Sequence, residues 1–178
     1  LEQTKLQLEQ YRASLLKSAF EGKLTENWRT KNSLNVEPEL IIIRKLNSEK
    51  LQKKSKSALE IPENISKLYS IPENWAWVRL GFLSKLITKG SSPKWQGIKY
   101  VDNGILFITS ENVGTGKILL AKPKFLEEQF NDIAKRSILQ KWDILTNIVG
   151  ASIGRTAIYD LTNIANINQA VALIRIHD

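Results

Sequence analysis

The chain has 178 residues with 26 Lys or Arg against 18 Asp or Glu, which gives a formal net charge of +8. It contains no cysteine and one histidine, so disulfides, thiolate zinc sites and Cys/His nucleophile pairs are excluded. The basic charge favours polyanionic partners. No apolar run reaches the roughly 18 residues of a membrane-spanning helix, so we expect no membrane association and a cytoplasmic protein.

Residues 1–22 are predicted to form a helix that ends at Gly22. Apolar side chains recur along one face in a heptad-like pattern. This stripe consists of Leu1, Leu8, Tyr11 and Leu15. The pattern alone leaves open whether the stripe packs on the rest of the chain or on a partner helix. Because the chain has no methionine and opens inside this helix, we expect it to be part of a longer protein.

Residues 23–70 are predicted to be a linker that contains one helix, at 38–54. A lysine-rich and serine-rich stretch follows this helix, which is typical of a solvated linker. The sequence IPEN occurs twice, at 61–64 and at 71–74. We interpret the first copy as linker and the second as the entrance to a domain that covers 71–178.

This domain is predicted to begin with a short strand in which Trp75 and Trp77 share one face and anchor the core, followed by leucines at helical spacing. The rest consists of short β-type runs separated by turns, with a helix or two short turns at 124–137. The expected strands are 104–109, 117–121, 143–149, 156–160 and 170–176. The predicted fold class is therefore α+β, with a long helix and linker before a mixed α/β domain that is incomplete at its C-terminus.

Catalytic motifs are missing from the sequence. The segment GASIGRT at 150–156 is one residue shorter than a phosphate-binding loop and has Arg155 where that loop has lysine. No Pro-Pro pair is present for a methyltransferase motif, and the Glu21/Lys23 pair lacks the acidic partner of a metal-dependent nuclease. The lone His177 has no ligand partner nearby. We therefore expect no catalytic residue, no metal and no cofactor.

A basic segment carries the main functional signal. Between Asn74 and Val101 there is no Asp or Glu, and the five cations of this interval include three in KGSSPKWQGIKY at 89–100. Glycine and proline shape such a loop, an aromatic ring can stack on bases, and lysines neutralise phosphates. Two further glycine-bearing loops, at 109–117 and 146–156, offer polar side chains that can approach base edges.

Several stretches in order resemble the specificity (HsdS) subunits of type I restriction-modification enzymes. LLKSAFEGKLTENWR is similar to the end of the central conserved helix of that family, and IPENWAWVRLGFL to the opening of a target recognition domain. KGSSPKW resembles its Gly-Ser/Thr-Pro turn. FITSENVGTGKI, DILTNIVGASIGRTAIY and NINQAVALIRI are similar to its successive strands and turns. The resemblance covers nearly the entire chain and is weakest at 30–65.

The resemblance implies a non-catalytic subunit that reads double-stranded DNA, while modification (methyltransferase) subunits methylate adenine and a restriction subunit cleaves. By order, the chain would hold the end of a spacer helix and the first part of the second target recognition domain. The stripe of the first helix would then pack on a second conserved helix. The additional upstream IPEN departs from the family pattern, which places the start of the domain in question.

The main hypothesis is therefore sequence-specific recognition of double-stranded DNA. The candidate DNA-binding residues are Lys89, Ser91, Lys94, Trp95, Ser110, Asn112, Lys117 and Arg155. Two alternatives remain open from the sequence. One is a protein-interaction scaffold whose basic loops are incidental, and the other is the specificity portion of a larger fused nuclease and methyltransferase.

Overall fold

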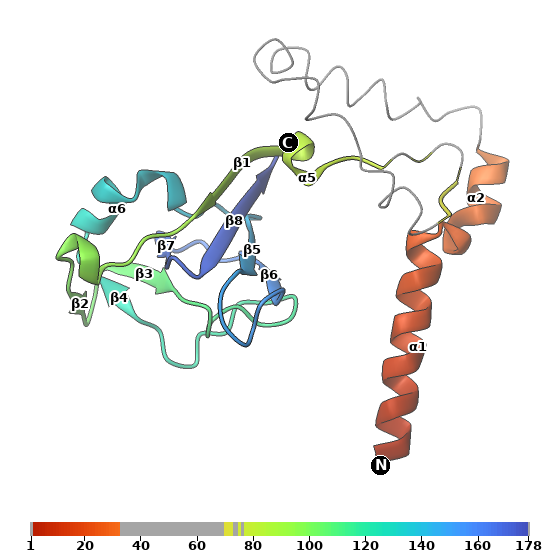
Figure 1. The fold of residues 1–178 in the computed structure, drawn as a ribbon, viewed down its shortest axis with the longest axis horizontal. Helices are drawn as coiled ribbons and strands as arrows, with labels where there is room; N and C mark the ends of the chain where they lie inside the picture. Colours follow the sequence, from red (N-terminus) through yellow and green to blue (C-terminus); the bar gives the residue numbers. More distant parts are fainter. Residues whose placement is uncertain (1, 33–69, 73–74, 76, 178) are drawn as a thin grey trace, which may run out of the picture. The chain divides into compact units, whose positions relative to one another are not determined.

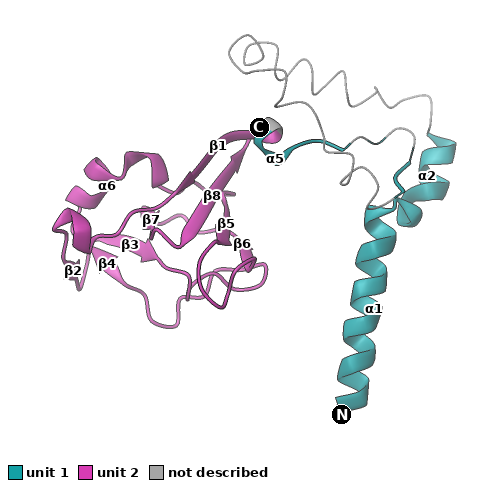
Figure 2. Cartoon of the chain, in the orientation of Figure 1, with its two compact units in different colours: residues 1–82 teal, residues 83–178 magenta. Residues whose placement is uncertain are grey.

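The computed structural model describes residues 2–32, 70–72, 75 and 77–177. The chain divides into two compact units, Leu1–Phe82 and Leu83–Asp178 (Figures 1 and 2). The helix expected at 38–54 and the first IPEN copy fall outside the described residues. The second unit begins at Leu83, and the domain start predicted at 71 stays a prediction; described residues of 70–75 contact the helical segments of the first unit.

The first unit begins with helix α1, Glu2–Phe20, which has an acidic residue in its first turn and Lys17 in its last turn, as the helix dipole favours. None of its side chains is buried. The helix ends before Gly22, whose φ of 73° turns the chain into η1, Lys23–Thr25, and then α2, Glu26–Lys31. The predicted stripe at Leu8, Tyr11 and Leu15 is therefore exposed, and within α1 only Ser18 and Ala19 are half-buried among the described residues.

The second unit is built from short strands with three brief helical segments between them. Its elements, together with the short helix that crosses the unit boundary, are α5 Leu80–Leu83, β1 Ser84–Lys89, η4 Lys94–Gln96, β2 Tyr100–Val101, β3 Ile105–Ile108, β4 Phe125–Leu126, α6 Gln129–Ile133, η5 Lys135–Ser137, β5 Ile144–Asn147, β6 Thr156–Ile158, β7 Ala165–Ile167 and β8 Val171–Ile176. The strands form two four-stranded sheets, one in the order β1-β8-β5-β6 and the other in the order β2-β4-β3-β7. The first sheet is fully antiparallel, whereas β3 and β7 of the second run parallel. The fold class is α+β, as predicted.

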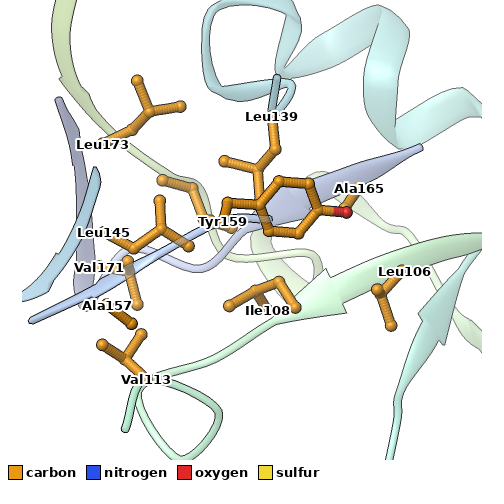
Figure 3. Close-up of a cluster of buried hydrophobic side chains, with 11 residues drawn as sticks. Leu106, Ile108, Val113, Leu139, Leu145, Ala157, Tyr159, Ala165, Val171 and Leu173 are labelled. Atoms are coloured by element: carbon orange, nitrogen blue, oxygen red, sulfur yellow. The ribbon is translucent and has the colours of Figure 1, made fainter. Parts of the chain in front are cut away.

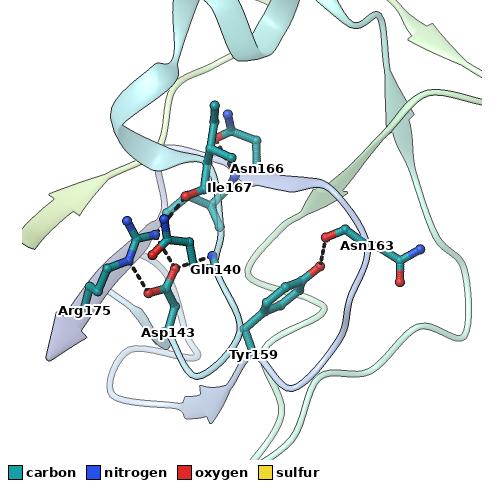
Figure 4. A network of polar contacts seen from close by, with 8 residues as sticks. Gln140, Asp143, Tyr159, Asn163, Asn166, Ile167 and Arg175 are labelled. Atoms are coloured by element: carbon teal, nitrogen blue, oxygen red, sulfur yellow. Dashed lines mark hydrogen bonds and ion pairs between the residues drawn. The ribbon is translucent and has the colours of Figure 1, made fainter. Parts of the chain in front are cut away.

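The main core lies between the two sheets. Buried side chains from β5, β6 and β8 on one side meet those from β3 and β7 on the other, and Tyr159 lies among them (Figure 3). The hydroxyl of Tyr159 donates to the carbonyl oxygen of Asn163 at 2.8 Å, which satisfies the one polar atom of this ring (Figure 4). A second, smaller cluster holds Phe107 edge-on to Phe130 of α6, with ring centroids 5.5 Å apart. Alternation along β3 thus sends Leu106 and Ile108 into the main core and Ile105 and Phe107 into the smaller cluster.

Some expectations about the elements were wrong. Residues 117–121 form no strand, because their segment closes a loop through a single bridge between Val113 and Ile118. Of the leucines expected at helical spacing, Leu80 and Leu83 lie in the short helix α5, but Leu86 lies in strand β1, which pairs with β8 along its length. Trp75 and Trp77 are half-buried and lie outside any strand.

Candidate nucleic-acid interface

Four turns of the second unit meet at one edge of the molecule, which we call the loop edge. It consists of the 89–92 turn after β1, the 109–118 loop after β3, the 148–155 loop between β5 and β6, and the 168–170 turn between β7 and β8. They meet because β1, β3, β5 and β7 all end there, while β6 and β8 begin there. Strands from both sheets thus position residues that are far apart in the sequence.

Backbone hydrogen bonds join these turns directly. The amide of Ser91 donates to the carbonyl oxygen of Ile167, and that of Gly90 to Val171, both at 3.3 Å. The amide of Asn168 donates to Ile108 at 3.0 Å, and that of Ile148 to Ala170 at 2.9 Å. The 168–170 turn and its flanking residues Ile167 and Val171 therefore hold the other segments together, and we call this stretch the hub.

Gly90 permits the closest of these approaches. A Cβ atom at this position would lie 1.9 Å from the carbonyl oxygen of Ile167 and 2.5 Å from that of Asn168. No side chain fits there, because real Cβ contacts do not fall below 3.0 Å. The glycine of the KGSSP segment thus serves to bring Lys89 and Ser91 against the hub.

Asn112 has a structural role in place of the DNA contact expected from the sequence. Its side chain is 7% exposed, and its Oδ1 accepts hydrogen bonds from the amide and hydroxyl of Thr109 at 2.9 and 3.0 Å. Its Nδ2 donates to the carbonyl oxygen of Leu119 at 2.9 Å. Because both ends of the carboxamide are used to close the neck of the 109–118 loop, Asn112 leaves the candidate interface, and Ser110 and Lys117 remain.

The 148–155 loop is closed at its base by a pair of backbone bonds. The amide of Asn147 donates to the carbonyl oxygen of Arg155 at 3.0 Å, and the amide of Gly154 donates back to Asn147 at 2.9 Å. Gly150 and Gly154 adopt φ values of 85° and 83°, which favour glycine. The side chain of Arg155 is exposed at this base. The loop is attached to its neighbour by a 2.8 Å bond from the amide of Gly116 to the carbonyl oxygen of Thr156.

A polar row crosses the outer face of the first sheet beside these loops. Lys89, Ala172, Thr146 and Thr156 are aligned in register across the four strands, and the two threonine hydroxyls lie 3.0 Å apart. Three strand spacings of about 4.8 Å separate the ends of the row by roughly 14 Å. The backbones of Lys89 and Thr156 therefore stand about as far apart as the two edges of a major groove, which is about 12 Å wide. Arg155 directly precedes Thr156, so its side chain starts from the other face of the strand.

The charge of the loop edge is positive. Lys89, Lys117 and Arg155 are exposed there. The carboxylate of the 109–118 loop, Glu111, is 3.2 Å from the ammonium of Lys124, so its charge is partly balanced. These three cations and the half-exposed hydroxyls of Ser91 and Ser110 form the part of the candidate interface that the structure brings together.

Lys94 and Trp95 lie in a separate segment. They belong to η4, which leads to Ile98 of the smaller core cluster and then to β2 at the edge of the second sheet. Trp95 is 83% exposed and packs on nothing that would account for a large apolar ring. The segment starts at the loop edge through Ser91 but then leads away from it, so these two residues flank the other candidates (Figure 1).

In the first unit, two of the stretches that carry the sequence resemblance contact each other: the one that ends at Arg29 and the one that contains Trp75. The guanidinium of Arg29 lies 5.5 Å from the ring centroid of Trp75. A Cβ at Gly22 would lie 2.4 Å from the Cγ of Pro72, so this glycine allows the chain before the second unit to approach the end of α1. Of the partner-helix residues, Leu8, Tyr11 and Leu15 are exposed, and Leu1 lies outside the described residues.

One residue at the loop edge was missed by the sequence analysis. Asn147, the last residue of β5, is 1% exposed, and it contacts two of the candidate loops. The available signal was a polar residue at the end of a buried strand, directly before a glycine-bearing loop.

The part of the chain that the structure describes holds no cluster of three or more His, Cys, Asp or Glu side chains that could bind a metal ion. Its helices are all too short or too polar to cross a membrane.

Comparison with known proteins gives structural matches only. No family model and no curated protein matches the sequence. One similar structure is described as the structural basis underlying complex assembly and conformational transition of the type I R-M system; it is 22% identical with a TM-score of 0.46. Another is the HsdS subunit from Thermoanaerobacter tengcongensis, 20% identical with a TM-score of 0.45. Each match covers 96% of this chain, which spans 37% of the length of each of those chains.

Proposed function

We propose that the second unit binds double-stranded DNA in a sequence-specific manner through the loop edge. The observation that carries this proposal is the convergence of three exposed cations, Lys89, Lys117 and Arg155, on turns joined by hydrogen bonds. Exposed cations on such turns can contact phosphates, which supplies affinity without sequence preference. The hydroxyls of Ser91 and Ser110 between them are suited to contact base edges, which supplies preference.

In this proposal the chain is the specificity part of a type I restriction-modification complex, and partner subunits methylate and cleave. The ordered sequence resemblance supports this assignment, together with the contact between Arg29 and Trp75, which joins two of the resembling stretches. The exposed side chains of Leu8, Tyr11 and Leu15 would pack on a second helix within that complex. Co-expression with a type I modification subunit, followed by mapping of methylated adenines, tests this assignment.

The binding itself is tested by the salt dependence of affinity for duplex DNA. The triple variant K89Q/K117Q/R155Q should reduce the slope of log K against log salt concentration by roughly 2.7, which is about 0.9 for each lost phosphate contact. A control variant, K135Q/R136Q/K141Q, removes the same charge from exposed residues of η5 and of the segment between η5 and β5, which enters β5 at the end opposite the loop edge. Equal slopes for the two variants would show that the loop edge is not the DNA-binding surface.

Sequence preference is tested by selection from a random duplex library. A specificity protein enriches one motif, since each mismatched base pair costs about 1–3 kcal/mol. A protein-interaction scaffold with incidental basic loops enriches none. If the selected duplexes share no motif, the binding is driven by charge alone, and this result would contradict the proposed function.

A further inference from the structure

We infer that Asn147 is the positioning residue that couples the two base-facing loops and thereby determines how selectively the loop edge reads DNA. The inference rests on the proposed function and assigns the specificity of that same surface to a residue that does not itself touch the DNA. It is drawn from three observations on Asn147: its contacts, its burial and an unpartnered oxygen.

Asn147 belongs to β5 of the first sheet, and its side chain contacts the loop after β3 of the second sheet as well as the loop after β5. Its Nδ2 donates to the carbonyl oxygen of Ser110 at 2.9 Å and to the Oγ of Ser152 at 2.9 Å. Ser110 begins the loop after β3, and Ser152 lies in the middle of the loop between β5 and β6. A single carboxamide therefore joins two loops that the backbone also connects where Gly116 meets Thr156 and Ala157.

The location of Asn147 explains why the coupling is rigid. It is the inner residue at the end of β5, in register with the buried Val171 of β8, and it is 1% exposed. Its own backbone closes the base of the 148–155 loop through bonds to Arg155 and Gly154. Because its backbone and side chain are both held, the two serines it contacts are held relative to the first sheet.

The unpartnered oxygen argues against a purely stabilising role. Among the residues that the structure describes, the buried Oδ1 of Asn147 has no hydrogen-bond partner. A buried acceptor without a partner lowers stability, and such groups in folded proteins call for an explanation other than packing. Asn147 thus lowers the stability of the fold through its unpartnered oxygen but positions Ser110 and Ser152. This combination is what we expect of a residue whose role is to set the geometry of the interface.

The test uses two substitutions at Asn147. Asn147→Leu is close in size and neutral, and it removes the donor to both loops. Asn147→Asp retains the shape and can still accept a hydrogen bond from the hydroxyl of Ser152, but it sets an oxygen against the carbonyl oxygen of Ser110. Asn163→Asp, at an exposed residue beyond β6, is the matched control for the added negative charge.

The first readout is amide hydrogen exchange of the protein without DNA. Both Asn147 variants should raise the exchange rates of the amides of Gly116 and Gly154 by about tenfold, because about 1.4 kcal/mol of local stability corresponds to a factor of ten. Unchanged exchange in these loops would overturn the coupling whether or not the protein binds DNA. This readout therefore separates failure of the inference from failure of the proposed function.

The second readout is discrimination in the random duplex selection. In Asn147→Leu the ratio of affinities for the enriched motif and for a scrambled duplex should decrease about tenfold or more, while affinity for the scrambled duplex and the salt slope stay unchanged. A merely structural role would weaken binding to both duplexes alike, and an unchanged ratio would also overturn the inference. If the Asn147 variants fail to fold, Ser152→Ala removes one of the two bonds and must show the same loss in smaller measure. A wild-type protein that enriches no motif overturns the proposed function and the specificity role together.

Discussion

The carboxylate of Asp143 accepts two hydrogen bonds from the guanidinium of Arg175, one from Nε to Oδ1 and one from a terminal nitrogen to Oδ2, each at 2.7 Å (Figure 4). Asp143 is 1% exposed. It also accepts from the amide of Gln140, while Arg175 donates to the carbonyl oxygen of Ile138. This bidentate pair joins the start of β5 to the end of β8, at the opposite end of both strands from the loop edge.

Loss of one member of this pair should destabilise the second unit without changing its DNA binding. Asp143→Asn leaves the Arg175 guanidinium without its charge partner, so we expect a decrease of about 3 kcal/mol in the free energy of unfolding. Urea denaturation measures the change, and Asp160→Asn, at an exposed carboxylate of the same unit, is the control. A decrease below about 0.5 kcal/mol, the usual range for surface substitutions, would contradict the structural importance of the pair.

Gly90→Ala should disrupt the attachment of the 89–92 turn to the hub. The added methyl would lie 1.9 Å from the carbonyl oxygen of Ile167, so either the 89–92 turn or the end of β7 must shift. Overpacking of this kind costs about 1–3 kcal/mol. Gly81→Ala is the matched control, because a Cβ at Gly81 meets no atom within 4 Å. Thermal denaturation of the two variants compares them directly, and equal stabilities would show that the close approach is not required.

Titration of Tyr159 should make the stability of the second unit decrease at alkaline pH. Burial, together with the smaller effect of the nearby carboxylate of Asp160, raises the pKa of its hydroxyl to about 12. An unfolded tyrosine titrates near 10. Between these values the folded state retains the proton that the unfolded state has lost, so stability decreases as pH rises from about 10 to about 12.

Tyr159→Phe should remove this part of the alkaline decrease. At neutral pH it should cost about 1 kcal/mol, because the hydrogen bond to Asn163 is lost. Denaturation curves at a series of pH values measure both effects. Tyr100→Phe, at an exposed ring, should retain the alkaline decrease of the wild type. An identical pH profile for wild type and Tyr159→Phe would contradict the assignment.

The strands that the sequence predicted well are those with strong local signals. The apolar runs at 104–109, 143–149, 156–160 and 170–176 correspond to β3, β5, β6 and β8, since each buries alternate or all side chains in the core. Strands β2, β4 and β7 are only two or three residues long and depend on pairing with distant segments. A single sequence carries no local pattern for such pairings.

The candidate site was predictable in composition but not in arrangement. The basic and glycine-bearing segments around Lys89, Ser110 and Arg155 stand out in the sequence, but their meeting follows from the strand order, which is non-local. The different roles of Asn112 and Asn147 depend on which carbonyl groups surround each carboxamide. Residue type alone does not distinguish an asparagine that reads bases from one that holds a loop.

The final prediction separates the loop edge from the η4 segment that flanks it. Lys89 belongs to the polar row of the first sheet, whereas Lys94 and Trp95 lie beyond Ser91 toward β2. If both segments contact one duplex, Lys89→Gln and Lys94→Gln should each reduce the salt slope by about one and weaken binding to all sequences alike. Trp95→Ala should weaken binding without changing the slope, because it removes a stacking surface and no charge. Fluorescence anisotropy with one duplex over a series of salt concentrations measures all three. An unchanged slope for Lys94→Gln together with unchanged affinity for Trp95→Ala removes the η4 segment from the interface and leaves the loop edge as the proposed DNA-binding surface.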